Sequence, residues 1–376
     1  MSLADGRTVQ GMRAADVRIA DVRAAAYRVA TEQPESDGTL EWDAVTVVVA
    51  EVDAGGHTGL GYTYTDAAAA GLIAGTLADA VRGRDAMATG GAWWAMVGAI
   101  RNLGWPGISA TAISALDVAL WDLKAKLLGL CLADLLGRAR DAVPIYGSGG
   151  LTSYPQRRLS EQLAGWVAQG IPRVKMKVGR EPDLDPARVR TAREAIGDDA
   201  ELFVDANGAY SRTQALALAD AYQQAGVTWF EEPVSSNDLA GLRHIRDRAP
   251  SGMAITAGEY GYDPGYFRRM LDAQAVDVLQ ADVTRACGIT GLQSVAALCI
   301  AYETPLSAHC APQIHAHAGC AIGPLCHCEY FHTHARAERI LFDGVLAPVN
   351  GSLIPDPVRP GLGIELRHAD AERYRV

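Results

Sequence analysis

The chain has no uninterrupted apolar run that approaches the roughly 18 residues typical of a membrane span, so the sequence predicts no transmembrane helix. It also lacks a charged opening segment followed by a long apolar core, and we therefore expect no signal peptide. Positive charge is in deficit, because 34 Lys and Arg residues stand against 44 Asp and Glu residues, for a formal net charge of −10. A nucleic acid or an anionic membrane is disfavoured as a partner, since either would need a clustered basic face.

Cysteine is scarce and irregularly placed, with seven residues that follow no regular spacing. We therefore expect no disulfide framework, and a reduced, cytoplasmic protein is the simplest interpretation. Low-complexity segments are absent, and an apolar fraction of 49% is enough for a large core. A length of 376 residues exceeds what one core usually supports, so two domains are expected.

The first third of the chain predicts an α+β unit. Three segments have the composition of antiparallel strands, at 17–29, 45–52 and 60–65. A long loop at 31–42 separates the first two. Apolar residues then recur at helical spacing in three segments, 66–81, 92–103 and 109–128. Ser109 suits the N-cap of the third helix and Gly129 its end. We assign residues 1–136 to this domain.

After a first strand at 143–148, short apolar runs that end in polar residues alternate with helical segments. The runs end at Lys177, Asp205, Glu231, Glu259, Asp282, His309 and Glu329. Consecutive ends from Lys177 to Glu259 lie roughly 27 residues apart, and Asp282 and His309 have the same separation. One strand, one helix and two connections need about that length. Because parallel strands of a closed barrel end at one rim, where barrel enzymes have their active sites, these side chains should ring one cavity.

The segments between the runs predict one helix after each strand, at 160–168, 182–196, 211–225, 238–249, 263–273, 289–302 and 314–321. Pro182 and Pro264 suit first helical turns. The tail from residue 342 is rich in Pro and Gly, and we expect it to return to the N-terminal domain rather than form an eighth helix. The predicted divisions are a barrel domain at 137–340 and a C-terminal segment at 341–376.

Three carboxylates at consecutive strand ends, those of Asp205, Glu231 and Glu259, predict a metal site. Carboxylate oxygens suit a hard divalent cation such as Mg²⁺, and without a cation they would repel one another. A single acid at a strand end could equally cap a helix or pair with Arg, but three at matched spacing favour a metal. Glu231 is preferred to Glu232, although alternation along a strand does not fix which points inward. Asn207 shares the face of Asp205 and is a candidate contact to substrate or metal-bound water.

Acid–base groups are predicted on both sides of these carboxylates. Lys175 and Lys177 are two residues apart on a strand, so both should face the cavity, and their mutual repulsion should keep one neutral enough to act as a base. Asp282 lies on the strand before that of His309, where it can hold one imidazole nitrogen and leave the other facing substrate. Glu329, on the next strand, would face the metal and could donate to a developing oxyanion.

A stretch rich in Cys and His, 310–334, raises the alternative of a zinc site. It contains none of the compact Cys-x-x-Cys pairs that structural zinc sites use. Cys326 and Cys328 alternate with His327 and Glu329 along a strand, so both thiols should point away from the cavity into packing. We therefore assign no zinc there.

Taken in order, the motifs resemble those of the enolase superfamily, specifically its mandelate racemase subgroup. They are Lys175-Met-Lys177, Asp205-Ala-Asn207, Glu231-Glu-Pro233, Gly258-Glu259, Asp282 with His309, and Glu329. The resemblance covers essentially the whole chain. It implies an α/β fold, a (β/α)7β modified TIM barrel with an N-terminal α+β capping domain.

The resemblance also implies Mg²⁺ on Asp205, Glu231 and Glu259, which would stabilise an enediolate formed when the proton α to a carboxylate is removed. Lys177 and the His309–Asp282 pair would act on opposite faces of the substrate, with Lys175 and Glu329 stabilising the charge. Capping segments at 31–42 and 54–63 would set specificity. Substrate contacts are assigned to Asn207, Tyr146, Trp42 and His57. The partner would be a small carboxylate, bound by a homo-oligomer.

The fate of the enediolate divides the possible reactions. Return of the proton from the other face makes a racemase or epimerase of a 2-hydroxy acid, and attack within the substrate makes a lactone cycloisomerase. We favour loss of a β-hydroxyl, the dehydration of an aldonate or aldarate, because an acid can stand on either face. Residues 55–65 also supply groups that suit a polyhydroxylated chain, namely His57, Thr58, Tyr62, Thr63 and Tyr64. A non-catalytic metal-binding barrel is the alternative of a different class.

Overall fold

The structure is a computed structural model and describes residues 17–376. The segment on which the absence of a signal peptide was judged lies outside the described residues. Among the residues described, no helix is both long and apolar enough to cross a membrane.

Three antiparallel strands form the predicted meander of the cap: β1 (Asp21–Ser36), β2 (Glu41–Ala54) and β3 (His57–Tyr64). The prediction of a long loop at 31–42 is wrong, because β1 and β2 continue through it and only residues 37–40 separate them. The pairing of the two strands shifts between Ala30 and Glu35. Pro34, which has no N–H to donate, lies within that irregularity, so the strand continues past a residue that usually breaks strands.

Helices of the cap follow β3 in the order α1 (Ala68–Leu72), the π-helical turn η2 (Ile73–Leu77), α2 (Ala78–Val81), α3 (Thr89–Ala99), α4 (Ile108–Leu128) and α5 (Leu132–Leu135). Helix α4 ends at Gly129 in the left-handed conformation, as predicted. The predicted N-cap is wrong, because Gly107 occupies that position and Ser109 lies in the first turn.

Strand β2 is buried on both faces and joins the cap to the barrel. Val48, Ala50 and Val52 pack with the cap helices, whereas Val47 and Val49 belong to the core that continues into the barrel. Because successive side chains of a strand point to opposite faces, one apolar strand supplies both cores.

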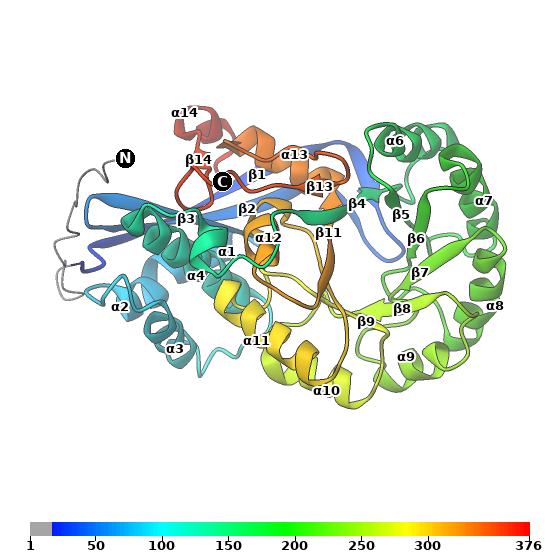
Figure 1. Cartoon of the computed structure of the whole chain (residues 1–376), viewed down its shortest axis with the longest axis horizontal. Coiled ribbons are helices and arrows are strands. Elements are labelled where there is room, and N and C mark those ends of the chain that lie inside the picture. The colour runs from blue at the N-terminus through cyan, green and yellow to red at the C-terminus, as the bar shows by residue number, and fades with distance from the viewer. Residues whose placement is uncertain (1–16) are drawn as a thin grey trace, which may run out of the picture.

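Eight parallel strands form the barrel, which the pairing of the first with the last closes. They are β4 (Val143–Gly149), β5 (Arg173–Lys177), β6 (Glu201–Asp205), β7 (Val227–Glu231), β8 (Ala254–Ala257), β9 (Val278–Ala281), β10 (Leu306–Ala308) and β11 (Leu325–Phe331). Figure 1 shows these strands ringed by helices on one side of the molecule, with the cap on the other.

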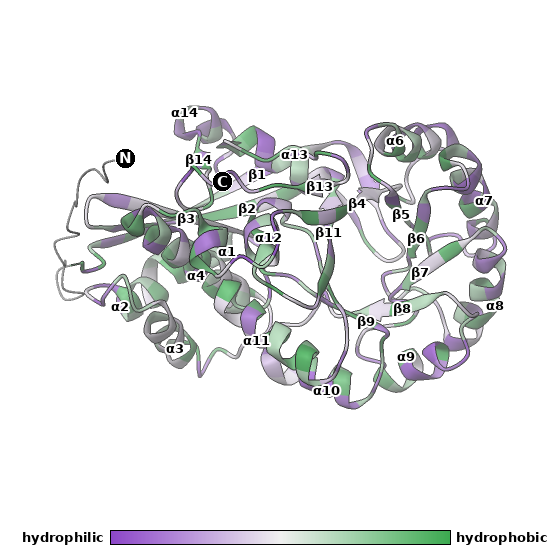
Figure 2. Ribbon diagram, in the orientation of Figure 1, coloured by the Kyte–Doolittle hydropathy of each residue, from purple (hydrophilic) through white to green (hydrophobic). Residues whose placement is uncertain are grey.

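The surrounding helices are α6 (Gln156–Ala168), α7 (Asp185–Ile196), α8 (Arg212–Gln223), α9 (Leu239–Arg246), α10 (Pro264–Asp272), α11 (Gly288–Ala301), α12 (Pro312–Cys320) and α13 (His332–Leu341). The outer helices carry both hydrophobic and hydrophilic residues (Figure 2), as expected of helices with one face on a core. Pro264 opens α10 as predicted, but Pro182 precedes α7, where Pro186 takes the first-turn position instead.

Helix α13 was not predicted. Its buried side includes His334 and Glu338, so the apolar periodicity that marks a helix is interrupted. The tail beyond it comprises β12 (Phe342–Asp343), β13 (Ser352–Leu353), β14 (Glu365–Leu366), α14 (His368–Ala371) and the 3₁₀ turn η3 (Glu372–Tyr374). It runs back along the cap, where the N–H of Val376 donates to the carbonyl of Ala26 at 3.1 Å.

Candidate active site

Strand ends place the three predicted metal ligands together. Asp205 and Glu231 are the last residues of β6 and β7 and lie opposite each other in the ladder. Glu259 follows β8 after one glycine. All three are buried, and one carboxylate oxygen from each lies within 4.8 Å of the others. The side chain of Glu231, preferred to Glu232 in the sequence, is the one that joins this group.

Gly258 sets the direction of Glu259. Its φ is +136°, and a Cβ at this position would lie 2.1 Å from the carbonyl oxygen of Gln280 on the neighbouring strand. Only glycine allows so close an approach at such a φ. The Gly-Glu pair is therefore required by the backbone path that turns the carboxylate toward the barrel axis.

Lys175 and Lys177 both point into the barrel from β5. The Nζ of Lys175 lies 2.6 Å from Glu231, 2.8 Å from Glu329 and 3.3 Å from Asp205. The Nζ of Lys177 lies 2.5 Å from Asp205. Burial lowers the pKa of each ammonium, but the adjacent carboxylates more than offset it and raise both pKa values. Because a cation on the same carboxylates would offset their negative charge, the expectation that one lysine is neutral enough to act as a base stays a prediction.

His309 and Asp282 form the predicted pair. The Nδ1 of His309 lies 2.8 Å from Oδ2 of Asp282, which leaves Nε2 facing the barrel interior, 3.2 Å from Glu259. Burial raises the pKa of Asp282, but the hydrogen bond and charge of His309 lower it to about 2 overall. The carboxylate therefore stays ionised and holds the imidazole in one orientation.

Glu329 and Tyr146 complete the inner face of the barrel near the lysines. Glu329 uses Oε1 for Lys175, and its Oε2 accepts from the backbone N–H of Cys310 at 3.2 Å. Tyr146 is fully buried, and its ring lies beneath Lys175, whose Nζ is 5.3 Å from the ring centroid. Its hydroxyl has no hydrogen-bond partner among the described residues.

The arrangement fits a hard divalent cation. Burial and the charge of Asp205 raise the pKa of Glu231 to about 8, which shows the cost of crowding these carboxylates together. An all-oxygen donor set of three converging carboxylates is what Mg²⁺ uses when it keeps other positions for water or substrate. The side-chain oxygen of Asn207, two residues after Asp205, is buried without a hydrogen-bond partner in the part of the chain described.

The turn of the β1–β2 hairpin covers the barrel rim. A Cβ on Gly38 would lie 2.5 Å from the carbonyl oxygen of Ala206 and 2.7 Å from that of Val178, so only glycine fits at the tip. Trp42 packs against the small cluster that contains Cys310 and Phe331, and its Nε1 donates to Glu35 at 2.9 Å. The structure thus places Trp42 near the barrel rim, against a cluster that includes the residue after His309.

The other predicted capping contacts are not at the rim. His57 starts β3 and pairs with Ala54, at the opposite end of the 14-residue strand β2 from Trp42. It lines a surface hollow with Arg23, Lys126 and His368. At about 3.4 Å per residue, roughly 40 Å of strand separates His57 from Trp42. The assignment of His57 to substrate binding, and of 54–63 to specificity, is therefore wrong.

The hydroxyl groups of β3 are also engaged elsewhere. Tyr62 and Tyr64 donate to Glu338 of α13, at 2.5 Å and 3.2 Å, and Thr63 donates to the carbonyl of Thr284 at 2.7 Å. These bonds attach the cap to the barrel. The expectation that this stretch recognises a polyhydroxylated chain is not supported, because its buried hydroxyls already have protein partners.

Replacing His57 by Ala should leave kcat/KM within about twofold, because exposed substitutions away from a site rarely change free energies by more than about 0.5 kcal/mol. Replacing Trp42 by Ala should lower kcat/KM at least about tenfold, since it removes a ring that packs against the rim cluster containing Cys310 and Phe331. Steady-state kinetics of the two variants checks both values. A large loss of kcat/KM in His57→Ala would show instead that this end of the cap contributes to the active site.

Three residues near the site were given no role from the sequence, although Glu232 was weighed as an alternative to Glu231 and Cys310 lies in the stretch considered for zinc. Arg285 lies 3.2 Å from Glu259 and 3.7 Å from Asp282, which it links. Glu232 is buried, and its Oε1 has no hydrogen-bond partner among the described residues. Cys310 lies directly against His309. Glu232 and Cys310 each follow a predicted site residue directly in the sequence, which was the signal available for them. The sequence around Arg285 contains no such signal.

The alternation predicted for β11 is observed. Cys328 packs in the barrel core outside the strands, whereas His327 lies inside with Tyr146, Phe203 and Trp229. Cys326 is half-buried, and its thiol donates to the carbonyl of Leu306 at 3.1 Å. These two thiols therefore take no part in the cavity.

A cavity of about 670 Å³ is lined by residues that neighbour the metal carboxylates along the chain, but by none of Asp205, Glu231, Glu259, Lys177 or His309. Asn207, Glu232 and Tyr260 line it from the barrel, and Thr39 and Pro106 line it from the cap. Pockets of this size, bounded by a few convergent polar groups, are typical binding sites for small molecules. The cavity is therefore a candidate position for the part of a substrate that lies outside the carboxylate group.

A closed α/β barrel with carboxylates and acid–base groups at the carboxyl rim, covered by a separate cap, defines a barrel enzyme. A family model described as the Mandelate racemase / muconate lactonizing enzyme, N-terminal domain, matches residues 21–137. One described as Enolase C-terminal domain-like matches residues 158–371. The chain belongs to the mandelate racemase and muconate lactonizing enzyme family of the enolase superfamily, as its motifs indicated.

Known proteins agree with this assignment. A mandelate racemase/muconate lactonizing enzyme-like protein from Rubrobacter xylanophilus is 56% identical, with a TM-score of 0.94 over 96% of this chain and 100% of that one. The 3,6-anhydro-alpha-L-galactonate cycloisomerase of Streptomyces coelicolor is 33% identical over 351 residues, 90% of this chain and 94% of the relative. Because such relatives are enzymes, the alternative of a non-catalytic barrel is set aside.

The L-talarate/galactarate dehydratase of Salmonella typhimurium is 32% identical over 283 residues, 74% of this chain and 71% of the relative. Its structure liganded with Mg and L-lyxarohydroxamate has a TM-score of 0.88 at 27% identity, over 100% of this chain and 96% of that one. Magnesium, predicted here from the donor set, is therefore confirmed as the cofactor of this kind of site.

Proposed function

We propose that the enzyme removes the proton α to the carboxylate of an acid sugar, an aldonate or aldarate, and eliminates the β-hydroxyl to leave a 2-keto-3-deoxy acid. One observation carries this. Lys177 contacts Asp205 at one end of the carboxylate group, and His309 contacts Glu259 at the other, at 2.5 Å and 3.2 Å. An acid or base therefore stands on each side of a substrate bound between them. The dehydratase from Salmonella supports the choice of reaction.

In this proposal Asp205, Glu231 and Glu259 hold Mg²⁺. When bound, the ion supplies positive charge against the negative charge that develops on the substrate carboxylate. The ammonium of Lys175 adds charge at the same place, because Glu231 and Glu329 fix its position at 2.6 Å and 2.8 Å. Interactions that strengthen as the charge develops lower the activation free energy of the reaction rather than only the KM.

The proton steps use the two flanking groups. Either Nζ of Lys177 or Nε2 of His309 takes the α-proton, according to the configuration of the substrate. The protonated partner then gives a proton to the leaving β-hydroxyl, so that water departs and the enol becomes a ketone. Asp282 keeps Nε2 of His309 directed at the substrate by holding Nδ1 at 2.8 Å.

The cap excludes water from this chemistry. The carbonyls of Ser36 and Asp37, at the hairpin turn, accept hydrogen bonds from Thr152 of the loop after β4, at 2.9 Å from its N–H and 2.7 Å from its hydroxyl. We propose residues 1–136 as the capping domain, 137–340 as the catalytic barrel and 341–376 as the segment that ties the two together. Asn207, Tyr146 and Trp42 remain proposed substrate contacts, Tyr146 acting through the Lys175 above it.

The support for an acid-sugar substrate comes from a different surface from the one that the sequence suggested. The hydroxyls of β3 are bonded to protein, but the cavity beside the carboxylates presents Asn207, Ser236, Tyr260 and Tyr266. The hydroxyl of Tyr266 is buried with no hydrogen-bond partner among the described residues. Such groups suit a chain of hydroxyls better than an aryl ring, because unpaired buried polar atoms gain most from a polar ligand.

Incubation with Mg²⁺ and a panel of aldonic and aldaric acids should yield a new ketone that semicarbazide traps, for at least one member of the panel. Chiral analysis and mass spectrometry of the same mixtures give the competing outcomes. Inversion at the α-carbon with no ketone would replace the dehydratase by a racemase or epimerase.

Cycloisomerisation is the second candidate, favoured by the 33% identity to the anhydrogalactonate cycloisomerase. The same two flanking groups would serve, since attack within the substrate follows the same α-proton chemistry. A product isomeric with the substrate that is a lactone or has a new ring, and that appears without semicarbazone, would select it.

Two further expectations stay proposals. We propose a homo-oligomer acting on a small carboxylate without nucleic acid or membrane, in a reducing compartment such as the cytoplasm, where seven free cysteines would be compatible. Light scattering of the purified protein gives the number of subunits, and a monomer at micromolar concentration would contradict the first part.

A further inference from the structure

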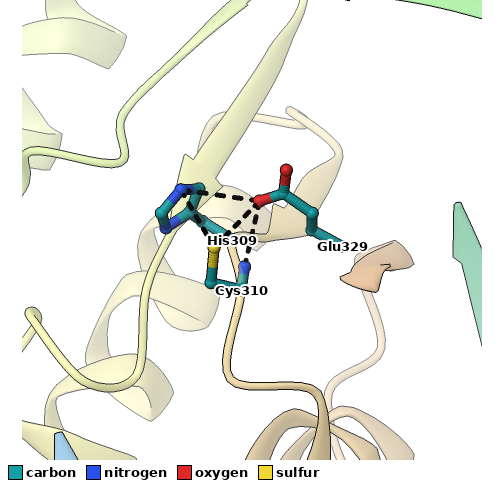
Figure 3. A group of neighbouring side chains, drawn as sticks. All are labelled: His309, Cys310 and Glu329. Atoms are coloured by element: carbon teal, nitrogen blue, oxygen red, sulfur yellow. Dashed lines mark hydrogen bonds and ion pairs between the residues drawn. The ribbon is translucent and has the colours of Figure 1, made fainter. Parts of the chain in front are cut away.

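Three side chains of different chemistry meet at the rim beside the magnesium carboxylates. Figure 3 shows His309, Cys310 and Glu329 directed toward a common point. All three are buried, and a nitrogen, a sulfur and an oxygen atom lie within 4.8 Å of one another. The reaction proposed above uses His309 and Glu329 but gives the thiol of Cys310 no task.

The distances within this group match three corners of a small metal tetrahedron. The Sγ of Cys310 lies 3.3 Å from Nε2 of His309 and 3.2 Å from Oε2 of Glu329, and Nε2 lies 3.5 Å from Oε2. Zinc bonds of about 2.0–2.1 Å to N and O and about 2.3 Å to S place tetrahedral neighbours roughly 3.3–3.6 Å apart. The donors therefore lie within a few tenths of an ångström of the spacing that zinc needs, and the sulfur would move slightly outward to leave a fourth corner for water.

The partners behind two of the three donors fix their orientation. Asp282 holds Nδ1 of His309 at 2.8 Å, the carboxylate–histidine arrangement that orients imidazole ligands and increases their basicity. Glu329 keeps Oε1 on Lys175 while Oε2 faces the thiol. The backbone of Cys310 has a φ of +52°, an uncommon conformation for a non-glycine residue. That backbone turn brings the thiol of one residue next to the imidazole of the residue before it.

We propose that His309 Nε2, Cys310 Sγ and Glu329 Oε2 form a second site, for a thiophilic divalent cation such as Zn²⁺ or Cd²⁺, and that its occupation inhibits the enzyme. Binding exchanges the protons of the thiol and the imidazole for the cation and releases them to solvent. Mg²⁺ does not compete, since it prefers oxygen donors and the thiolate selects softer ions. Inhibition rests on the proposed function of His309, because a metal on Nε2 blocks proton transfer there; binding does not rest on it.

Cadmium binding tests the site without any assay of activity. With Mg²⁺ saturating, the full chain should take up one equivalent of Cd²⁺ that produces the ultraviolet thiolate-to-cadmium charge-transfer band. Cys310→Ser should lose the band and bind Cd²⁺ at least about tenfold more weakly, since outer contacts alone change metal affinity by about 10- to 100-fold. Cys326→Ser, which removes the half-buried thiol of β11, is the matched control and should keep the band. Equal bands in the wild type and Cys310→Ser would overturn the proposal.

Inhibition is measured separately, with each variant compared with its own rate in the absence of Zn²⁺. The zinc concentration that halves the rate should rise at least about tenfold in Cys310→Ser and stay unchanged in Cys326→Ser. Equal sensitivity of wild type and Cys310→Ser would overturn inhibition through this site and leave the proposed function intact. A cadmium band at Cys310 with no inhibition by Zn²⁺ would instead contradict the role of His309 in turnover.

Discussion

Replacing Asp205 by Asn, or Glu231 by Gln, should reduce turnover at least about a thousandfold. The metal contributes several kcal/mol of charge stabilisation to such reactions, and each increment of about 1.4 kcal/mol is a factor of ten in rate. Both residues are fully buried at the ends of adjacent strands, so each substitution removes a charged oxygen donor from the interior of the site. Turnover on an active acid sugar gives the loss in rate.

Loss of the metal must be separated from loss of the fold. Mg²⁺ at about 100 times its Kd should add about 2.7 kcal/mol to the stability of the wild type, and the rise in Tm should nearly vanish in both variants. Circular dichroism should remain that of the wild type. Asp199→Asn, at an exposed position before β6, is the matched control and should change neither quantity. Full activity of the wild type after chelation of Mg²⁺ would refute the metal site.

Lys177→Ala and His309→Asn should each abolish exchange of the substrate α-hydrogen with solvent deuterium for one configuration, and spare the other. The reason is that the two groups contact opposite ends of the carboxylate group, so each reaches one face of the substrate. Positioned acids and bases contribute about 10²- to 10⁴-fold, and losses in kcat of this size are expected. Proton NMR in deuterium oxide measures the exchange for each configuration.

His309→Asn has a second acceptable outcome, in which exchange survives and elimination fails, because the imidazole would then be the acid for the leaving hydroxyl. Lys124→Ala on α4 and His244→Asn on α9 are controls of matched chemistry outside the barrel rim. Retained turnover in Lys177→Ala or His309→Asn would remove that residue from the mechanism.

The rim residues were predictable because their placement follows from local rules. A strand that ends in a charged residue, followed by a helix of fixed length, puts that residue at the same height in each unit of a parallel barrel. Asp205, Glu231, Glu259, Asp282 and His309 obeyed this rule and lie together. Whether Glu231 or Glu232 joins them needed the structure, because both side chains are buried near the site and alternation alone does not choose.

The predictions for the cap failed where they depended on long-range contacts. The two turns of the meander lie at opposite ends of its sheet. Their composition does not say which of them meets the barrel. The β1–β2 turn does so through Gly38, whereas His57 lies at the far end. Tyr62 and Tyr64 were predicted to suit a substrate because their hydrogen-bond partner could not be foreseen. That partner, Glu338, lies on α13, a helix that the sequence did not predict.

The alternation of strands and helices, and the meeting of Asp205, Glu231, Glu259 and the His309–Asp282 pair at one rim, could be predicted from the sequence by itself, because each follows from periodicity and spacing along the chain, whereas the cap over the barrel was implied by the resemblance to a known family. Tertiary structure alone decided which carboxylates surround the two lysines, the end of the cap that covers the rim, and the meeting of Cys310 with His309 and Glu329. These depend on which groups from distant segments share a buried volume, where a few ångströms and the absence of water fix each interaction.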